Sequence, residues 1–283
     1  MSVPADMRAA AAVGMLHAWW AERVPDRLAI ASPHGDRTYA DLNANINRLA
    51  RALRTRGLGQ GDAIAVMCTN RPEFLEVLYA SQRIGLRFTP INWHLTGSEA
   101  AYIVENCEAK AFVCSADVGD AVQGAVAGGG SGGAGLVTIN TGGYLPGFEM
   151  YNAVLADEDG SNIEDPVAGT QMLYTSGTTG RPKGVHREAA AVSALATVNF
   201  CGYDEDWAHS LDAHLLTGPL YHAAPLAFSV AVPYLYGVPV VLMDHWDPVE
   251  ALRLIESHGI THTHMVPTMV HRLLALPEEE RTR

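Results

Sequence analysis

Short apolar segments alternate with longer amphipathic segments along this chain, and the alternation limits the folds that are open to it. Segments such as 63–68 and 111–114 have the length of buried strands, whereas 39–53 repeats apolar residues at three- and four-residue steps. Strands that are apolar on both sides belong in a sheet that is covered on both faces. We therefore predict an α/β fold with largely parallel sheets covered by helices, and the length of 283 residues predicts two packed units.

Local start signals support the helices of this alternation. Thr38 is followed three residues later by Asp41, and Thr96 by Glu99, and both pairs are typical of a capping box. Asp247 precedes a proline, which is typical of a helix N-cap followed by the first helical residue. From these signals we predict helices at about 38–57, 72–84, 96–105, 188–200, 225 onward, 247–258 and 268–276, and strands at about 63–68, 88–91, 111–114, 136–139, 171–174, 214–216, 238–243 and 261–266.

Two segments have unusual compositions. Segment 213–243 contains no Asp, Glu, Lys or Arg, but prolines and glycine cut it into pieces too short to cross a bilayer, so we predict a buried strand, a helix and a strand. Segment 124–135 contains seven glycines and one serine. Because a packed element does not tolerate so many glycines, we predict a flexible surface loop there.

Charge and cysteine content exclude several classes of function. The 31 acidic and 19 basic residues give a formal charge of −12, which would repel a nucleic-acid backbone. Cys68, Cys107, Cys114 and Cys201 show no paired or zinc-ligand spacing, and the histidines show none that indicates a metal site. From the charge we predict no nucleic-acid partner, and from the spacing we predict reduced thiols and no protein-bound metal. The N-terminus has no secretory signal, so we predict a cytoplasmic location.

One polar segment has the composition of a phosphate-binding loop. After the apolar approach 171–174, the ten residues 175–184 contain four hydroxyl side chains, three glycines, one arginine and one lysine. Glycines allow the backbone to approach a ligand closely, and hydroxyls with Lys183 can bind anionic oxygens. It is not a Walker A loop, because Pro182 precedes the lysine and Gly184 follows it. An ordinary surface turn is the alternative.

The segment Leu-Tyr-Thr-Ser-Gly-Thr-Thr-Gly-Arg-Pro-Lys-Gly-Val-His at 173–186 resembles the phosphate loop of the adenylate-forming superfamily. Segments 38–42, 90–92, 218–222 and 266–268 are also similar to motifs of that family, in the same order. The chain is thus identified as resembling the N-terminal part of an AMP-forming acyl-CoA synthetase. The resemblance implies two α/β subdomains, here 56–203 and 1–55 together with 204–283.

The resemblance implies a two-step ligation with ATP, Mg²⁺ and coenzyme A. A carboxylate attacks the α-phosphate of ATP, pyrophosphate leaves, and the thiol of coenzyme A then attacks the acyl-adenylate. Lys183 and His222 are the implied catalytic residues, and His222 would orient the carboxylate or gate its pocket; a buried core histidine is the alternative. The implied ATP-binding residues are Thr175, Ser176, Gly177, Thr178, Thr179, Gly180 and Lys183, with Arg181 in support.

The segment after Gly218 narrows the substrate class. Amino-acid-activating relatives place an aspartate after this segment, whereas 221–232 contains no acidic residue, which favours an apolar acid such as a fatty or related acid. The expected substrate-contacting residues are Tyr221, His222, Ala223 and Phe228, although ordinary core packing is the alternative for them. Peripheral membrane contact and a homodimer stay open, but a transmembrane segment is not expected.

Relatives in this family carry further segments after the position that corresponds to residue 283: the adenine and magnesium segment, the ribose-binding aspartate, the hinge and the C-terminal lysine. We therefore expect the second subdomain to be incomplete and the C-terminal domain to be absent, so that this chain by itself does not complete thioester synthesis. A non-catalytic nucleotide- or acyl-binding homologue is the alternative function.

Overall fold

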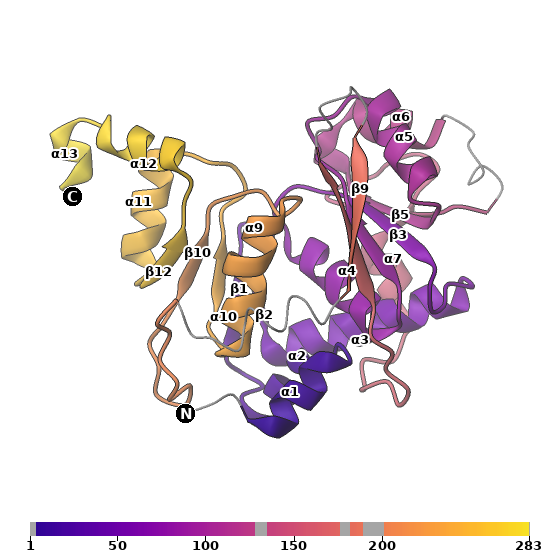
Figure 1. Cartoon of the computed structure of the whole chain (residues 1–283), viewed down its shortest axis with the longest axis horizontal. Helices are drawn as coiled ribbons and strands as arrows, with labels where there is room; N and C mark the ends of the chain where they lie inside the picture. The colour runs from indigo at the N-terminus through magenta and orange to yellow at the C-terminus, as the bar shows by residue number, and fades with distance from the viewer. Residues whose placement is uncertain (1–3, 128–134, 176–181, 189–200, 283) are drawn as a thin grey trace.

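The computed structural model describes residues 4–127, 135–175, 182–188 and 201–282 (Figure 1). In this part of the chain the strands form two sheets, and both are largely parallel. Helices cover the sheets, as the alternation of apolar and amphipathic segments predicts. The predicted fold class is confirmed.

The seven-stranded sheet has the order β7-β6-β5-β3-β4-β8-β9. All neighbours are parallel except β8 and β9, which pair antiparallel. The central strand β3 is buried along its whole length, which explains its uninterrupted apolar sequence. The strands are β3 (Ala63–Met67), β4 (Arg87–Pro90), β5 (Ala109–Ser115), β6 (Val137–Thr141), β7 (Glu149–Met150), β8 (Thr170–Thr175) and β9 (Lys183–Glu188).

The five-stranded sheet has the order β12-β10-β11-β1-β2 and combines both ends of the chain. Strand β1 pairs parallel with β11, more than 200 residues later, whereas β1 and β2 pair antiparallel. Its strands are β1 (Leu28–Ala31), β2 (Arg37–Thr38), β10 (His214–Leu216), β11 (Val240–Leu242) and β12 (His262–His264). The charge-free segment forms β10, a helical stretch and β11, as predicted.

The helical elements in the described part of the chain mostly cover these sheets, although α12 and α13 contain no buried residue, and α3 contacts both α2 and α4. They are α1 (Ala5–Ala12), α2 (Leu16–Arg23), α3 (Tyr39–Thr55), α4 (Pro72–Arg83), α5 (Gly97–Asn106), η1 (Ala116–Val118), α6 (Asp120–Ala127), α7 (Tyr151–Ala156), α9 (Ala223–Leu226), the π-helical turn η2 (Ala227–Ala231), α10 (Val232–Leu235), α11 (Pro248–Ser257), α12 (Pro267–Leu274) and α13 (Glu278–Arg281). Among them, no helix is both long and apolar enough to cross a membrane.

The three helix starts that were predicted from capping signals are confirmed at the level of hydrogen bonds. Thr38 and Asp41 form a reciprocal capping box at α3, and Thr96 and Glu99 form a second one at α5. Asp247 accepts a hydrogen bond from the backbone N–H three residues later and caps α11. These contacts involve neighbouring residues only, so their geometry follows from short sequence patterns.

Two predictions about loops are wrong in the described residues. The flexible loop was predicted to begin at Gly124, but Gly124 lies in α6, and 128–134 fall outside the described residues. A Cβ added to Gly97 of α5 would lie 2.7 Å from the Cα of Gly124. The two helices meet through these glycines, so the residue serves close packing rather than flexibility. Lys183, expected in a loop, begins strand β9, which the prediction omitted. The predicted helix at 188–200 falls outside the described residues except for Glu188, which ends β9.

A buried histidine makes the stability of the fold depend on pH. His17 is fully buried, and neither of its ring nitrogens has a hydrogen-bond partner; the rings of Tyr79 and Tyr234 lie 4.0 and 4.8 Å from it. Burial is the main reason why the pKa of His17 lies well below its usual value, and the positive charge of Arg83 lowers the pKa further. The folded protein therefore keeps this ring neutral at pH values where the unfolded chain binds a proton.

We expect the free energy of unfolding to fall as pH decreases from 7 to 5, because only the unfolded state gains a proton at His17. Each such group contributes up to about 1.4 kcal/mol per pH unit below its unfolded pKa. His17→Phe should reduce the slope by about this amount in denaturant unfolding at several pH values. An unchanged slope would contradict the assignment. His214, whose pKa burial lowers to about 3, adds a slope of the same sign in both proteins.

Candidate functional site

The β8–β9 hairpin holds the described part of the predicted phosphate loop. Thr175 ends β8 and lies opposite Lys183, the first residue of β9, and both residues are exposed. Residues directly opposite in an antiparallel pair have neighbouring side chains. The hydroxyl of Thr175 therefore lies just before the segment that connects β8 and β9, and the ammonium group of Lys183 lies just after it. The connecting segment is 176–182, and six of its residues lie outside the described part of the chain: Ser176, Gly177, Thr178, Thr179, Gly180 and Arg181.

Helix α5 supports this hairpin from one side. The Tyr174 hydroxyl donates a hydrogen bond to Asn106 Oδ1 at 2.6 Å, and the Tyr102 hydroxyl donates one to the carbonyl of Pro182 at 3.5 Å. The two bonds hold one residue of β8 and the residue immediately before Lys183. The ends of the hairpin are thus tied to a helix whose own N-terminus is fixed by a capping box.

The second predicted motif forms the turn between β10 and α9. The N–H of His222 donates to the carbonyl of Pro219 at 3.1 Å, and His222 is the N-cap residue of α9. Gly218 permits the tight path of the turn, since a Cβ there would lie 2.8 Å from the ring of Pro225. His222 is exposed rather than buried in the core, so its ring is accessible to a ligand beside this turn.

The pKa values of Tyr221 and His222 in this turn are shifted from their usual values. The rings of Tyr221 and His222 lie 4.5 Å apart. Neighbouring protein atoms displace part of the water around both rings, which lowers the pKa of the exposed His222 and raises the pKa of the half-buried Tyr221, so both groups favour their neutral forms. A neutral imidazole can accept or donate a hydrogen bond, as a group that orients a carboxylic acid or its adenylate must.

The remaining predicted substrate residues lie on the helical stretch after the turn. Ala223 and Phe228 are half-buried, and the ring of Phe228 lies 5.3 Å from the ring of His264 on β12. Phe228 belongs to the π-helical turn η2, a geometry often found at functional sites. The stretch therefore offers an apolar surface beside an imidazole, next to the turn that carries His222.

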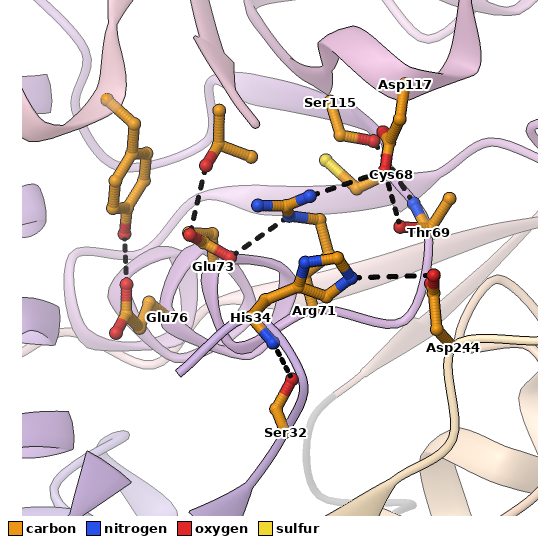
Figure 2. A network of polar contacts seen from close by, with 12 residues as sticks. Ser32, His34, Cys68, Thr69, Arg71, Glu73, Glu76, Ser115, Asp117 and Asp244 are labelled. Carbon is orange, nitrogen blue, oxygen red and sulfur yellow. Dashed lines mark hydrogen bonds and ion pairs between the residues drawn. The ribbon is translucent and has the colours of Figure 1, made fainter. Parts of the chain in front are cut away.

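A polar network that the motifs did not predict lies where β3, β5 and β6 end (Figure 2). Arg71 contacts Glu73 and Asp117, each at 3.3 Å, and Glu73 accepts a hydrogen bond from Thr141 at 3.0 Å. Thr69 donates to the same Asp117 at 3.4 Å. Ligands of open α/β sheets bind outside the carboxyl ends of the strands. The signal available in the sequence was the run of polar residues directly after the apolar strand 63–68.

A search for metal ligands in the described ranges finds no group of three or more His, Cys, Asp or Glu side chains arranged to hold an ion. The cysteines agree with the prediction of reduced thiols. Cys68, Cys107 and Cys114 are buried, Cys201 is half-buried, and all four are free. Burial raises the pKa of each thiol, which makes them poor nucleophiles.

Residues 17–283 match the family described as AMP-binding enzyme, and the chain belongs to this family. Curated relatives include CoA ligases and a fatty acid–[acyl-carrier-protein] ligase: the chain is 32% identical over 263 residues to an indoleacetate–CoA ligase of Aromatoleum aromaticum, and 30% identical over 264 residues to a feruloyl-CoA synthase of an Amycolatopsis species. Each match covers 89% of this chain and 49% or 50% of the relative. The chain thus spans about half the length of the curated relatives it matches.

Solved structures show the same fold. A putative long-chain-fatty-acid CoA ligase of Rhodopseudomonas palustris superposes with a TM-score of 0.82 at 24% identity, covering 95% of this chain and 67% of that one. The anthranilate CoA ligase AuaEII, solved with anthranoyl-AMP, also gives 0.82 at 19% identity, covering 94% of this chain and 52% of that one. At these identities the structures establish the fold of this chain and not its substrate.

Proposed function

We propose that this chain supplies the phosphate-binding and acid-binding parts of an ATP-dependent ligase, which converts an apolar carboxylic acid to its acyl-adenylate and then to its CoA thioester. The observation that carries the proposal is the pairing of Thr175 with Lys183 at the two ends of a segment rich in glycine and hydroxyl groups. Membership of the AMP-binding enzyme family and the CoA ligases among its relatives support it.

Each part of the site has a chemical role in this proposal. Negative charge grows on pyrophosphate as it leaves, and Lys183 with the loop hydroxyls would stabilise that charge. His222 would orient the carboxylate of the acid at the N-terminus of α9. The apolar surface around Ala223 and Phe228 would hold its chain or ring. The names of the relatives include both aryl and fatty acid ligases, so we propose an apolar acid without choosing its length or ring content.

Magnesium and coenzyme A enter the proposal as co-substrates. Magnesium, bound with ATP, would neutralise phosphate charge during departure of pyrophosphate. The described residues include no group of metal ligands, so we assign the ion no ligand on this chain. Coenzyme A supplies the thiol that takes up the acyl group in the second step.

We also propose that the chain divides into 56–203 and 1–55 with 204–283. The membership of the two sheets supports this division, because strands between 63 and 188 make one sheet and strands from both ends of the chain make the other.

The sequence allows a direct test of ATP binding, because Lys110 and Lys183 are its only lysines. An amine-reactive label followed by peptide mapping should modify both, and Mg-ATP should protect Lys183 but not Lys110, which pairs with Asp62 at 2.6 Å. Acid-dependent exchange of labelled pyrophosphate into ATP then tests the chemistry. Unchanged labelling of Lys183 would contradict the proposed site. Protection of Lys183 without exchange for any apolar acid, even when the C-terminal half of a related ligase is supplied, would instead favour a nucleotide-binding protein that is not a ligase.

A further inference from the structure

The side chain of Asn70 connects the carboxyl ends of the two sheets. Asn70 follows β3 of the seven-stranded sheet and is 4% exposed. Its Nδ2 donates hydrogen bonds to the carbonyl of Met243 at 2.9 Å and to the carbonyl of Gly218 at 3.1 Å. Its Oδ1 accepts a hydrogen bond from the N–H of Leu220 at 2.9 Å. Residues 218, 220 and 243 follow strands of the five-stranded sheet, so one side chain makes three bonds from one sheet to the other.

Two of these bonds hold the turn that carries His222. Gly218 and Leu220 lie in the turn between β10 and α9, and Leu220 is buried in the core. The second half of the turn is held by its own backbone bond between His222 and Pro219. Asn70 therefore holds the first half of the turn, Gly218 and Leu220, to the seven-stranded sheet. The backbone hydrogen bond from His222 to Pro219 in turn holds His222 to this first half.

The same sheet that carries Asn70 also carries the phosphate-loop hairpin. Strand β3 pairs with β4, β4 pairs with β8, and β8 pairs with the strand that begins at Lys183. The two proposed reactants thus meet groups from different sheets: ATP meets Lys183, and the acid meets His222. The hydrogen bonds of Asn70 to Gly218 and Leu220 join the two sheets close to the His222 turn.

We propose that Asn70 is a positioning residue, which holds the acid-orienting turn in place relative to Lys183 on the β8–β9 hairpin. The inference rests on the proposed function. The carboxamide suits this task because it donates two hydrogen bonds and accepts others with one planar group. Aspartate would retain the acceptor for Leu220 but would place a carboxylate against two carbonyl oxygens. Alanine would leave all three backbone groups without this partner.

The kinetic test compares Asn70→Ala with Asn47→Ala in acid-dependent pyrophosphate exchange. Asn47 is a control of similar burial, because it is fully buried, donates hydrogen bonds to Gly160 and Asn162 and accepts one from the buried Arg83, all away from the turn. We expect Asn70→Ala to lower kcat/KM for the acid on the order of a hundredfold, as misplacement of a reacting group by about 1 Å does. Protection of Lys183 by Mg-ATP should occur at the same ATP concentration as in the parent protein.

Asn70→Asp provides a second readout, which a purely structural role would not change. Burial raises the pKa of a carboxyl group, and a protonated carboxyl can donate one of the lost hydrogen bonds. We expect the exchange activity of Asn70→Asp, relative to the parent protein, to rise as pH decreases from 8 to 6. The proposal is overturned if Asn70→Ala weakens ATP protection and acid turnover equally, or if Asn47→Ala produces the same selective loss.

Hydrogen exchange separates this inference from the proposed function. Even if no acid supports pyrophosphate exchange, Asn70→Ala should accelerate amide exchange in peptides covering 218–226, whereas peptides covering β8 should exchange as before. That result would support the connection made by Asn70 and place the failure in the proposed reaction. Unchanged exchange at 218–226 would show that Asn70 does not hold the turn.

Discussion

Replacement of Lys183 by alanine is expected to lower acid-dependent pyrophosphate exchange at least a hundredfold. Removing one group that stabilises transition-state charge typically costs about 2.7–4 kcal/mol in activation free energy. The side chain is exposed and begins a strand, so its loss should change the free energy of unfolding by only about 0.5 kcal/mol or less. Exchange kinetics and denaturant unfolding of the same preparation measure both quantities.

Two control variants make the Lys183 result specific. Lys110→Ala removes the other lysine and its ion pair with Asp62, and should leave exchange unchanged. Lys183→Arg keeps the charge but changes the shape of the donor, and should recover part of the activity. If Lys183→Ala exchanged pyrophosphate at the parent rate, the assignment of Lys183 to the nucleotide would be wrong.

Trp20→Ala is expected to have the largest effect on stability, lowering the free energy of unfolding by about 3–5 kcal/mol. The Trp20 side chain is fully buried, its Nε1 donates a hydrogen bond to the carbonyl of Tyr234 at 2.7 Å, and its ring lies 5.3 Å from that of Trp207. A Cβ on Gly237 would lie 2.6 Å from the ring, so the backbone approaches the indole closely on that side. Alanine would leave a cavity that these neighbours cannot fill without shifting.

Denaturant unfolding of Trp20→Ala measures this loss, with Tyr144→Ala as a matched aromatic-to-alanine change at a side chain that is 78% exposed. The control should lie within about 0.5 kcal/mol of the parent protein. Trp20→Phe should be intermediate, since it retains a ring but loses the hydrogen bond to Tyr234. A loss below about 1 kcal/mol for Trp20→Ala would mean that the site collapses without strain.

Much of the secondary structure could be predicted from short patterns. The capping boxes at Thr38 and Thr96 and the cap at Asp247 involve residues three positions apart, so the sequence pattern and the contact are nearly the same information. Predictions based on composition were less reliable. The glycines after residue 123 indicated a loop, but Gly124 allows α6 to contact α5 at Gly97, and a partner 27 residues away cannot be identified from composition.

The candidate site was only partly predictable. The motif around Lys183 was evident, but strand β9 was not, because its pairing with β8 forms across a polar segment. Asn70 and Arg71 looked like an ordinary polar end of a strand. Asn70 gains its importance from Gly218, 148 residues later, and Arg71 from Asp117, 46 residues later. No periodicity or local spacing encodes contacts of this kind.

The sequence by itself determined the fold class, three helix starts, the family resemblance and the residues of the proposed phosphate loop, because each is encoded in short patterns or in the order of such patterns along the chain. Only the tertiary structure decided that β1 lies beside β11, that Thr175 faces Lys183, and that Asn70 connects the His222 turn to the other sheet. The physical reason is that chain folding brings distant polar groups together at the carboxyl ends of parallel strands, where their hydrogen bonds must be satisfied by partners that local sequence does not specify.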